Sequence, residues 1–362
     1  MRTNSAGQTG FFGLQSLKLL KKFMAKFSDY TIATIGSHTA LQILRGAKDE
    51  GFRTICVCQK GQERPYRSFG VADEIITVDN YAKFPEIESQ LIESNAIVIP
   101  HGSFVSYLGP AKIAQLKVMH YGTKAILDWE ADRVKQRSWL EKAGLRLPSV
   151  FKTPEDIDRP VIVKFHGALG GMGYFIANSP KEFYERFNRY QGDRDYVIQE
   201  YIVGVPIYTH YFYSNLTDEL EIMSFDKRYE SNADSIGRIA AKDQLDVGIE
   251  TSYTITGNIP LVVRESLLPE LFTMGESVVK ESRKLTGGYG LFGPFCLEAI
   301  VDKNLNFYVF EISARIVAGT NPFVNGSPYT WLRYNEPMST GRRVAREIKT
   351  AIESDALDKV LG

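Results

Sequence analysis

Two glutamates near the C-terminus have the residue type and spacing of a shared cation site. Glu298 and Glu311 each lie in a segment rich in aromatic and β-branched residues, and the polar residues 302–306 separate the segments. This pattern predicts two strands joined by a turn. Two carboxylates side by side on one face repel each other unless a positive charge lies between them, and their oxygens favour a hard divalent cation. The pair therefore predicts a site for Mg²⁺, or for Mn²⁺, shared with substrate phosphates.

This prediction depends on how the two strands pair. A hairpin folded midway between residues 304 and 305 predicts three facing pairs: Val301 with Tyr308, Ile300 with Val309, and Glu298 with Glu311. A register shifted by one residue would instead turn one carboxylate to solvent, because neighbouring side chains point to opposite faces. The hairpin alone leaves both arrangements open.

A glycine-rich loop earlier in the chain has the composition of a flap over phosphates. Lys164 lies in the strand-like segment before the loop, Gly170 and Gly171 are two of its four glycines, and residues 174–177 again read as a strand. Glycines let backbone N–H groups approach phosphate oxygens, and Lys164 would supply a positive charge. The loop is not a Walker motif, because no Gly-Lys-Ser/Thr follows and no helix begins at its end. The alternative is a plain flexible turn.

Two further features could contact the same nucleotide. A strand that ends at Glu200 and continues into Tyr201 and Ile202 can present backbone groups to an adenine edge. Arg315 follows Glu311 by four residues and can reach the phosphates. The alternative for the first feature is an ordinary strand with one acidic residue. The alternative for Arg315 is a surface ion pair, which contributes little to stability.

The elements that must position these residues begin with a parallel sheet. Strand-like and helical segments alternate from residue 31, with strands expected at 31–35, 54–58, 74–78 and 96–100, and this alternation indicates an α/β domain. Ser37 and His38 follow the first strand and Ser103 follows the last, where ligands of such sheets bind. Ser37 and His38 open a helix that can capture phosphate, or else form an ordinary helix cap; Ser103 can equally be a turn hydroxyl.

The second half of the chain has a different composition. A helix is expected over residues 129–143, followed by short strands, the glycine loop and a helix over 180–190. Mixed strands and helices then continue to about residue 335, and the last 20 residues read as helical.

The overall composition excludes several classes of function. The 362 residues contain 43 Lys plus Arg and 43 Asp plus Glu, so no net field attracts nucleic acid or an anionic membrane. The three cysteines, at 56, 58 and 296, form neither a zinc motif nor a disulfide framework, which fits a reducing cytoplasm. No apolar run is long enough to span a membrane.

Residues 1–28 differ from the rest. Apolar side chains recur there at helical spacing and three lysines share the other side. A basic amphipathic helix can lie on a membrane, dock on a partner or pack on its own fold, and we assign it no chemistry.

The order of these motifs resembles that of the ATP-grasp superfamily across residues 132–320. The segment from Asp132-Arg133 to Pro148 looks like the superfamily's first phosphate-binding helix, and the flap, the adenine hinge at 200–202 and the two metal-binding glutamates follow in order. The resemblance implies that Arg133, with Lys164 and the flap, binds ATP. There are departures: Arg133 replaces the usual Lys, with Lys135 nearby, and Ser313 replaces the usual Asn ligand. The acid that binds ribose is absent after the hinge, and Glu230 would take its place.

Within that superfamily the chain resembles the formate-dependent synthetases of 5-formaminoimidazole-4-carboxamide ribonucleotide (FAICAR). The motifs that carry this resemblance are residues 35–42, 100–103, 257–260, 264–266 and 293–298. The resemblance implies that His38, Ser103 and Asn258 hold aminoimidazole carboxamide ribonucleotide (AICAR), that the enzyme forms homo-oligomers, and that formyl phosphate is the intermediate.

The implied fold is an α/β, more closely α+β, ATP-grasp architecture in four parts. These are an extension (1–28), a pre-ATP-grasp domain with a parallel sheet (29–125), a lid subdomain with its linker helix (126–205) and a C-terminal subdomain with the metal site (206–362). Two other functions remain open: an ATP-grasp ligase that joins a different acid and amine, and a paralogue that binds purine nucleotides without turnover.

Overall fold

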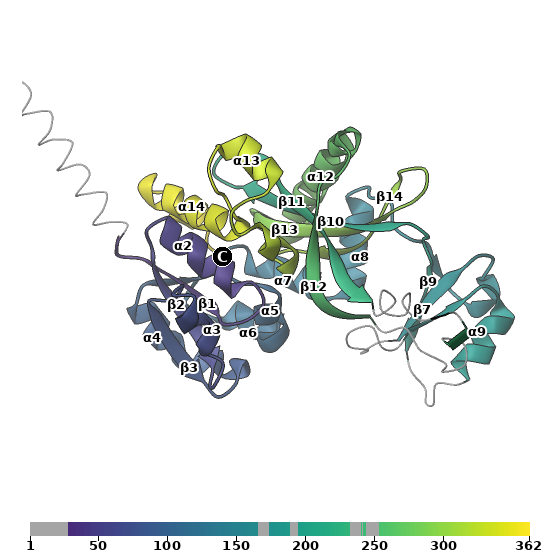
Figure 1. Ribbon diagram of the computed structural model, residues 1–362, viewed down its shortest axis with the longest axis horizontal. Coiled ribbons are helices and arrows are strands. Elements are labelled where there is room, and N and C mark those ends of the chain that lie inside the picture. The colour runs from purple at the N-terminus through teal and green to yellow at the C-terminus, as the bar shows by residue number, and fades with distance from the viewer. Residues whose placement is uncertain (1–27, 166–173, 189–194, 232–239, 241, 244–252) are drawn as a thin grey trace, which may run out of the picture.

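Three β-sheets lie along the length of the molecule, each with helices packed on it (Figure 1). The computed structural model describes residues 28–165, 174–188, 195–231, 240, 242–243 and 253–362. Residues 1–27 and the glycine loop with Gly170 and Gly171 lie outside this part of the chain, so the predictions made for them stay predictions.

The N-terminal sheet is parallel and has the strand order β3-β2-β1-β4-β5. Its strands are buried apolar runs, as expected for a sheet covered on both faces. The elements are β1 (Thr31–Ile35), α2 (Ala40–Asp49), β2 (Arg53–Gln59), α3 (Arg64–Ser68), β3 (Glu74–Val78), a 3₁₀ helix (Tyr81–Ile87), α4 (Glu88–Glu93), β4 (Ala96–Val98), α5 (Gly102–Leu108), α6 (Pro110–Gln115) and β5 (Met119–His120). The alternation read from the sequence is therefore confirmed in this domain.

The smallest sheet is antiparallel, has the order β6-β9-β7-β8 and encloses its own apolar core. Phe165, Phe175 and Phe183 form the centre of that core. The elements are β6 (Val150–Phe151), a 3₁₀ helix (Pro154–Asp156), β7 (Val161–Phe165), β8 (Tyr174–Ala177), α9 (Pro180–Phe187) and β9 (Tyr196–Glu200).

The central sheet is also antiparallel, with the order β12-β11-β10-β13-β14. Its elements are β10 (Val205–Ser214), β11 (Glu219–Ser231), β12 (Tyr253–Leu261), a 3₁₀ helix (Glu265–Leu267), α12 (Leu268–Thr286), β13 (Gly293–Val301), β14 (Phe307–Ser313), a 3₁₀ helix η4 (Ala318–Phe323), α13 (Pro328–Tyr334), α14 (Thr340–Glu353) and a 3₁₀ helix (Leu357–Lys359). The side chain of Tyr211 stacks on Phe295 within this sheet, with ring centroids 4.8 Å apart.

The helix expected over residues 129–143 is two helices, so that prediction was wrong in detail. α7 (Lys124–Ala131) ends before Asp132, and α8 (Arg133–Lys142) begins after it. The Asp132 carboxylate accepts hydrogen bonds from the backbone N–H groups of Val134 and Lys135 and so caps α8. α8 packs on α12, where the Trp139 indole donates to the Val278 carbonyl over 3.0 Å.

The hairpin register near the turn also differs from the prediction. The pairs are Val301 with Phe307, Ile300 with Tyr308 and Ala299 with Val309, one residue away from those expected. A register shift between Glu298 and Ala299 then restores the expected pairing of Glu298 with Glu311. The extra residue on the bulged strand is Phe310, because two residues there oppose one on the partner.

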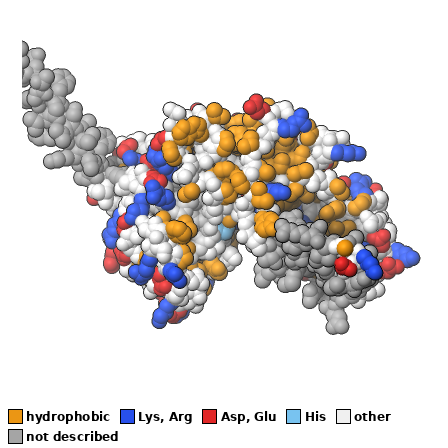
Figure 2. Space-filling view, viewed as in Figure 1, with side chains coloured by type: hydrophobic (Ala, Val, Ile, Leu, Met, Phe, Trp, Pro, Cys, Tyr) orange, Lys and Arg blue, Asp and Glu red, His pale blue; other side chains and the backbone are white. Residues whose placement is uncertain are grey.

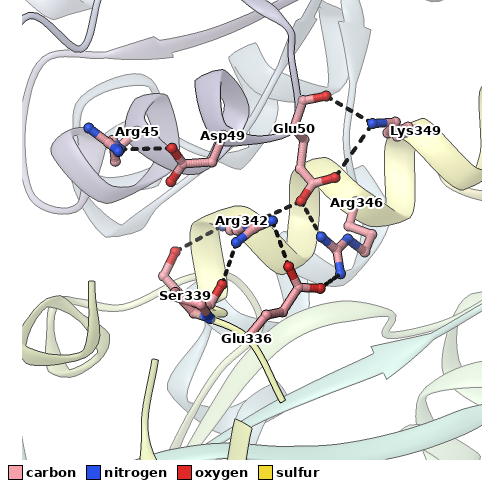
Figure 3. A network of polar contacts seen from close by, with 9 residues as sticks. Arg45, Asp49, Glu50, Glu336, Ser339, Arg342, Arg346 and Lys349 are labelled. Atoms are coloured by element: carbon pink, nitrogen blue, oxygen red, sulfur yellow. Dashed lines mark hydrogen bonds and ion pairs between the residues drawn. The ribbon is translucent and has the colours of Figure 1, made fainter. Parts of the chain in front are cut away.

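An ion-pair network joins the N-terminal domain to the C-terminal helix (Figure 3). Glu50, just after α2, accepts from Arg342 over 2.7 Å and from Arg346 over 2.6 Å, both on α14. The two helices cross closely: a Cβ on Gly46 would lie 2.5 Å from the Arg342 Cα. Glycine at this crossing is therefore required for the backbones to approach.

The surface carries exposed apolar side chains around α12 and α13 (Figure 2). Trp331 and Leu332 on α13 are 51% and 83% exposed, and Val262 nearby is 69% exposed. Within the described ranges, no helix has both the length and the apolar character needed to cross a membrane.

Candidate active site

One cavity of about 220 Å³ lies between the N-terminal loops and the central sheet. Its walls come from the loop after β1, from strands β10 to β14 and from the start of η4. Among its lining residues are both predicted metal ligands and two of the predicted substrate residues: Glu298, Glu311, His38 and Asn258. Residues separated by up to 273 positions in sequence thus meet in one site.

The two carboxylates of the predicted metal site are close and only partly neutralised. Glu298 forms an ion pair with Arg228, whose guanidinium lies over the Tyr208 ring, 4.7 Å from its centroid. The other carboxylate oxygen of Glu298, Oε2, is buried and has no hydrogen-bond partner among the described residues. Burial, and then the charge of Glu311, raise the pKa of Glu298 well above its usual range.

These residues fit a divalent cation. An unpartnered, buried carboxylate oxygen beside a second carboxylate is an all-oxygen donor pair whose negative charge is only partly neutralised. Ser313, two residues after Glu311 on β14, also lines the cavity, so its hydroxyl is available at the place where the superfamily usually has Asn.

Arg315 lies inside the site and is not the surface ion pair considered as the alternative. Its side chain is 14% exposed and its Nη2 lies 2.9 Å from the Glu130 carboxylate, which also accepts from the Ala314 backbone N–H. The Nε of Arg315 is buried without a partner in the described part of the chain. Burial raises the pKa of Glu130, and Arg315 opposes that rise.

The two strand ends of the parallel sheet that carry Ser37 and Ser103 lie together. The Ser37 hydroxyl donates to the Ser103 hydroxyl over 3.0 Å. His38 has a positive φ of 52° and its ring stacks on His101, with centroids 5.4 Å apart. A Cβ on Gly102 would lie 3.0 Å from the His38 Nε2 and 3.2 Å from the Arg315 Cζ, so this loop, the histidine and the arginine converge.

Asn258 lines the same cavity but is held by residues that the sequence analysis missed. Its Nδ2 donates to Asp226 over 2.7 Å, and the other oxygen of Asp226 accepts from His210 Nε2 over 2.7 Å. Asp226 and His210 are each 1% exposed.

The residues predicted to bind ATP lie at the other end of the site, towards the small sheet. Lys164 on β7 donates to Gln199 over 2.9 Å. Burial, and then the charge of Arg133, lower the pKa of Lys164, while Glu311 opposes this. The charges of Arg133 and Glu311 thus both act on Lys164.

The hinge residues follow directly. Glu200 ends β9, and its carboxylate accepts from the Ser149 backbone N–H over 3.1 Å. The Tyr201 N–H donates to the Pro160 carbonyl over 2.9 Å, so this N–H already has a partner and Ile202 is the better candidate for an adenine edge. Glu230 lies on β11, and its side chain is outside the described part of the structure.

The site residues that the sequence analysis did not single out differ in whether the sequence carries a signal for them. Asp226 and Arg228 are two apart on one strand, so both point to the same face. That spacing is a readable signal. Glu130 and His210 carry none, because the partner of each comes from a distant part of the sequence.

Comparison with known proteins identifies the family. Residues 32–151 match a protein family of unknown function, DUF1246, and residues 187–362 match a domain of unknown function, DUF1297. A 5-formaminoimidazole-4-carboxamide-1-(beta)-D-ribofuranosyl 5'-monophosphate synthetase from Pyrococcus abyssi is 57% identical over 337 residues, covering 91% of this chain and 98% of the relative. The synthetase of the same name from Methanocaldococcus jannaschii is 50% identical, with 92% and 95% covered.

Solved structures agree with this. An IMP biosynthesis protein, PurP, from Thermococcus kodakaraensis has a TM-score of 0.71 and 31% identity, covering 91% of this chain and all of that chain. The biotin carboxylase domain of the Hydrogenobacter thermophilus 2-oxoglutarate carboxylase, complexed with MgADP and bicarbonate, has a TM-score of 0.61 at 13% identity, covers 91% of this chain and 72% of that chain, and shows the ATP-grasp fold alone. The chain belongs to the family of 5-formaminoimidazole-4-carboxamide ribonucleotide synthetases.

Proposed function

We propose that the chain catalyses the ATP-dependent formylation of AICAR to FAICAR in IMP biosynthesis, with formate as the acyl donor. ADP and phosphate are the other products. The observation that carries the proposal is the single cavity in which the paired carboxylates, Arg315 and Asn258 meet. It combines groups for phosphoryl transfer with groups for a polar heterocycle, and the relatives described above are named as synthetases of the formylated product.

The chemistry explains why ATP is needed. Formate is a poor acylating agent, since its leaving group would be an oxide. Attack of a formate oxygen on the γ-phosphorus breaks the bond to the β-phosphate oxygen, releases ADP and gives formyl phosphate. The exocyclic amine of AICAR then attacks the formyl carbon, the C–O bond to phosphate breaks and the amine loses one proton.

Glu298 and Glu311 would hold Mg²⁺, or Mn²⁺. The ion supplies charge neutralisation for the phosphate oxygens. Arg228 balances Glu298 in the absence of other cations, because it forms an ion pair with that carboxylate. Arg315, fixed by Glu130, adds a positive charge on the cavity side of the pair.

The ATP molecule would extend from this pair towards the small sheet. Lys164 and Arg133 would contact its phosphates, residues 200–202 its adenine and Glu230 its ribose, and the loop with Gly170 and Gly171 would exclude water from the acyl phosphate. Ser37, His38 and Ser103 would hold the phosphoribosyl end of the second substrate, with Asn258 near its base. A half-buried Lys164 whose pKa is lowered by burial and by the charge of Arg133 is consistent with a site built to receive an anion.

Measurement of ADP release tests the proposal directly. With ATP and Mg²⁺ present, ADP release should require both formate and AICAR, and omission of either should reduce the rate to background. A stimulation by another carboxylate but not by formate would indicate a ligase for a different acid. A nucleotide that binds tightly and is never turned over would indicate a binding paralogue.

The proposal includes a homo-oligomeric, cytoplasmic enzyme with the four-part division given above. The exposed Trp331, Leu332 and Val262 form an apolar surface of the kind that subunits cover. Cys56, Cys58 and Cys296 are free thiols, as in a reducing compartment. Light scattering coupled to gel filtration tests the homo-oligomeric state, since a monomer at micromolar concentration would contradict it.

A further inference from the structure

Three polar side chains on neighbouring strands form a continuous hydrogen-bonded chain in the wall of the cavity. His210 lies on β10, Asp226 on β11 and Asn258 on β12. Asp226 accepts from His210 through Oδ1 and from Asn258 through Oδ2, each over 2.7 Å. All three residues line the cavity.

The carboxylate of Asp226, at the centre, determines which groups donate in these hydrogen bonds. An ionised aspartate only accepts hydrogen bonds, so His210 must donate from Nε2 and Asn258 must donate from Nδ2. The amide of Asn258 is thereby held in one orientation, with its carbonyl oxygen Oδ1 as the atom left to meet a ligand. A free asparagine could present either its oxygen or its NH₂ group.

Two of the three hydrogen-bonded side chains are shielded from solvent, which makes the direction of their hydrogen bonds hard to reverse. Asp226 and His210 are almost completely buried. The backbone at Gly319 in η4 lies directly against them, since a Cβ there would come within 2.6 Å of the His210 Cε1. The Nδ1 of His210 is buried and has no partner among the described residues, so moving the histidine proton to Nδ1 would leave a buried donor unsatisfied.

We propose that Asp226 is a positioning residue that fixes Asn258 as a hydrogen-bond acceptor. This wall of the cavity then selects a heterocycle that carries an N–H donor, either an exocyclic amino group or a carboxamide group. The inference rests on the proposed function, because it concerns how the amine substrate is recognised. Asp226, which accepts a hydrogen bond from His210, thereby contributes to substrate selection. Within the described part of the chain, the hydrogen bonds of Asp226 and His210 involve none of the groups assigned above to the phosphates.

Exchange of the two partners gives a sharp test. Asn258→Asp places two carboxylates in contact, and we expect the KM for AICAR and its Kd by calorimetry without ATP to rise at least tenfold. Asp226→Asn alone should also raise both at least tenfold, because its NH₂ group would replace one acceptor oxygen and face a donor, either His210 Nε2 or Asn258 Nδ2. In the double variant the new amide donates to the new carboxylate, which again presents only acceptors, and both constants should return to within threefold of the original. The KM for ATP should stay within twofold throughout.

The controls separate the possible failures. Asp218→Asn, in the exposed turn between the same strands, should leave all constants unchanged. Thermal melting identifies any variant that fails to fold, and His210→Gln, which keeps a donor towards Asp226, then serves as a milder variant expected to stay within threefold. A double variant no better than Asn258→Asp, an unaffected Asp226→Asn, or equal changes in both KM values would overturn the inference. Absence of formate-dependent ADP release in the original enzyme would instead overturn the proposed function.

Discussion

Glu298 and Glu311 face each other across β13 and β14 because a β-bulge next to Glu298 corrects the register set by the turn. Without the extra residue, the pairing near the turn would continue and Glu298 would face Phe310 instead. Bulges are placed where a side chain has to be re-aimed. Here the bulge sets the buried Glu298 beside the half-buried Glu311, at a cost that a positive charge offsets.

Replacement of one of these carboxylates should separate catalysis from folding. We expect Glu311→Gln to abolish measurable turnover, a fall of roughly a thousandfold or more, while the melting temperature in the absence of ligands stays the same or rises, because the charge that repels Glu298 is gone. Steady-state ADP release and thermal melting measure the two effects. Glu353→Gln, on the exposed end of α14, is the matched control. Normal turnover in Glu311→Gln would remove the metal assignment.

Glu130 should act through Arg315. In Glu130→Gln the amide oxygen can still accept from the Ala314 N–H, but the charge partner of Arg315 is lost. We expect kcat to fall about ten- to a hundredfold with a smaller change in the KM for ATP. Glu141→Gln on the exposed side of α8 is the control. A proportional loss of kcat and folded protein would show that Glu130 is structural only.

Much of this site could be predicted from sequence, and the reasons for the gaps are physical. The pairing of Glu298 with Glu311 was predicted correctly although two of its neighbouring pairs were wrong, because a bulge inserts one residue without a clear sequence signal. The rule that ligands bind beyond the carboxyl ends of parallel strands singles out Ser37 and Ser103, and the structure brings their hydroxyls into contact.

Other contacts were not predictable in this way. His210 pairs with Ser224 across β10 and β11, and Asp226 lies diagonally from it, two residues further along β11. Arg228 reaches Glu298 across β10, which separates their two strands in the sheet. Such contacts depend on the order of strands in the sheet, which local patterns do not determine.

Buried histidines should make stability fall in acid. His120 is 1% exposed, and burial lowers its pKa from 6.5 to about 4. Because the folded pKa is below the unfolded value, this group's stabilising contribution is complete above pH 6.5 and is lost as pH falls towards 4; over that window it amounts to about 3 kcal/mol.

The contribution of His120 can be isolated. His120→Asn keeps a donor towards the Gly122 carbonyl but does not titrate. Urea unfolding at several pH values should show a shallower fall in the free energy of unfolding between pH 6.5 and 4, while any cavity cost stays constant with pH. Parallel curves for the two proteins would contradict the assignment.

The junction between α2 and α14 should depend on one carboxylate. Glu50 is 4% exposed and is the shared partner of Arg342, Arg346 and Lys349 (Figure 3). We expect Glu50→Ala to lower the free energy of unfolding by about 3 to 5 kcal/mol, because three cations lose a buried partner. Asp49→Ala removes only an exposed pair with Arg45 and should cost less than about 1 kcal/mol. Since the N-terminal loops contribute His38 to the cavity, Glu50→Ala should also raise the KM for AICAR before it affects that for ATP. Equal destabilisation by the two neighbouring substitutions would show that helix contacts, and not this carboxylate, hold the domains together.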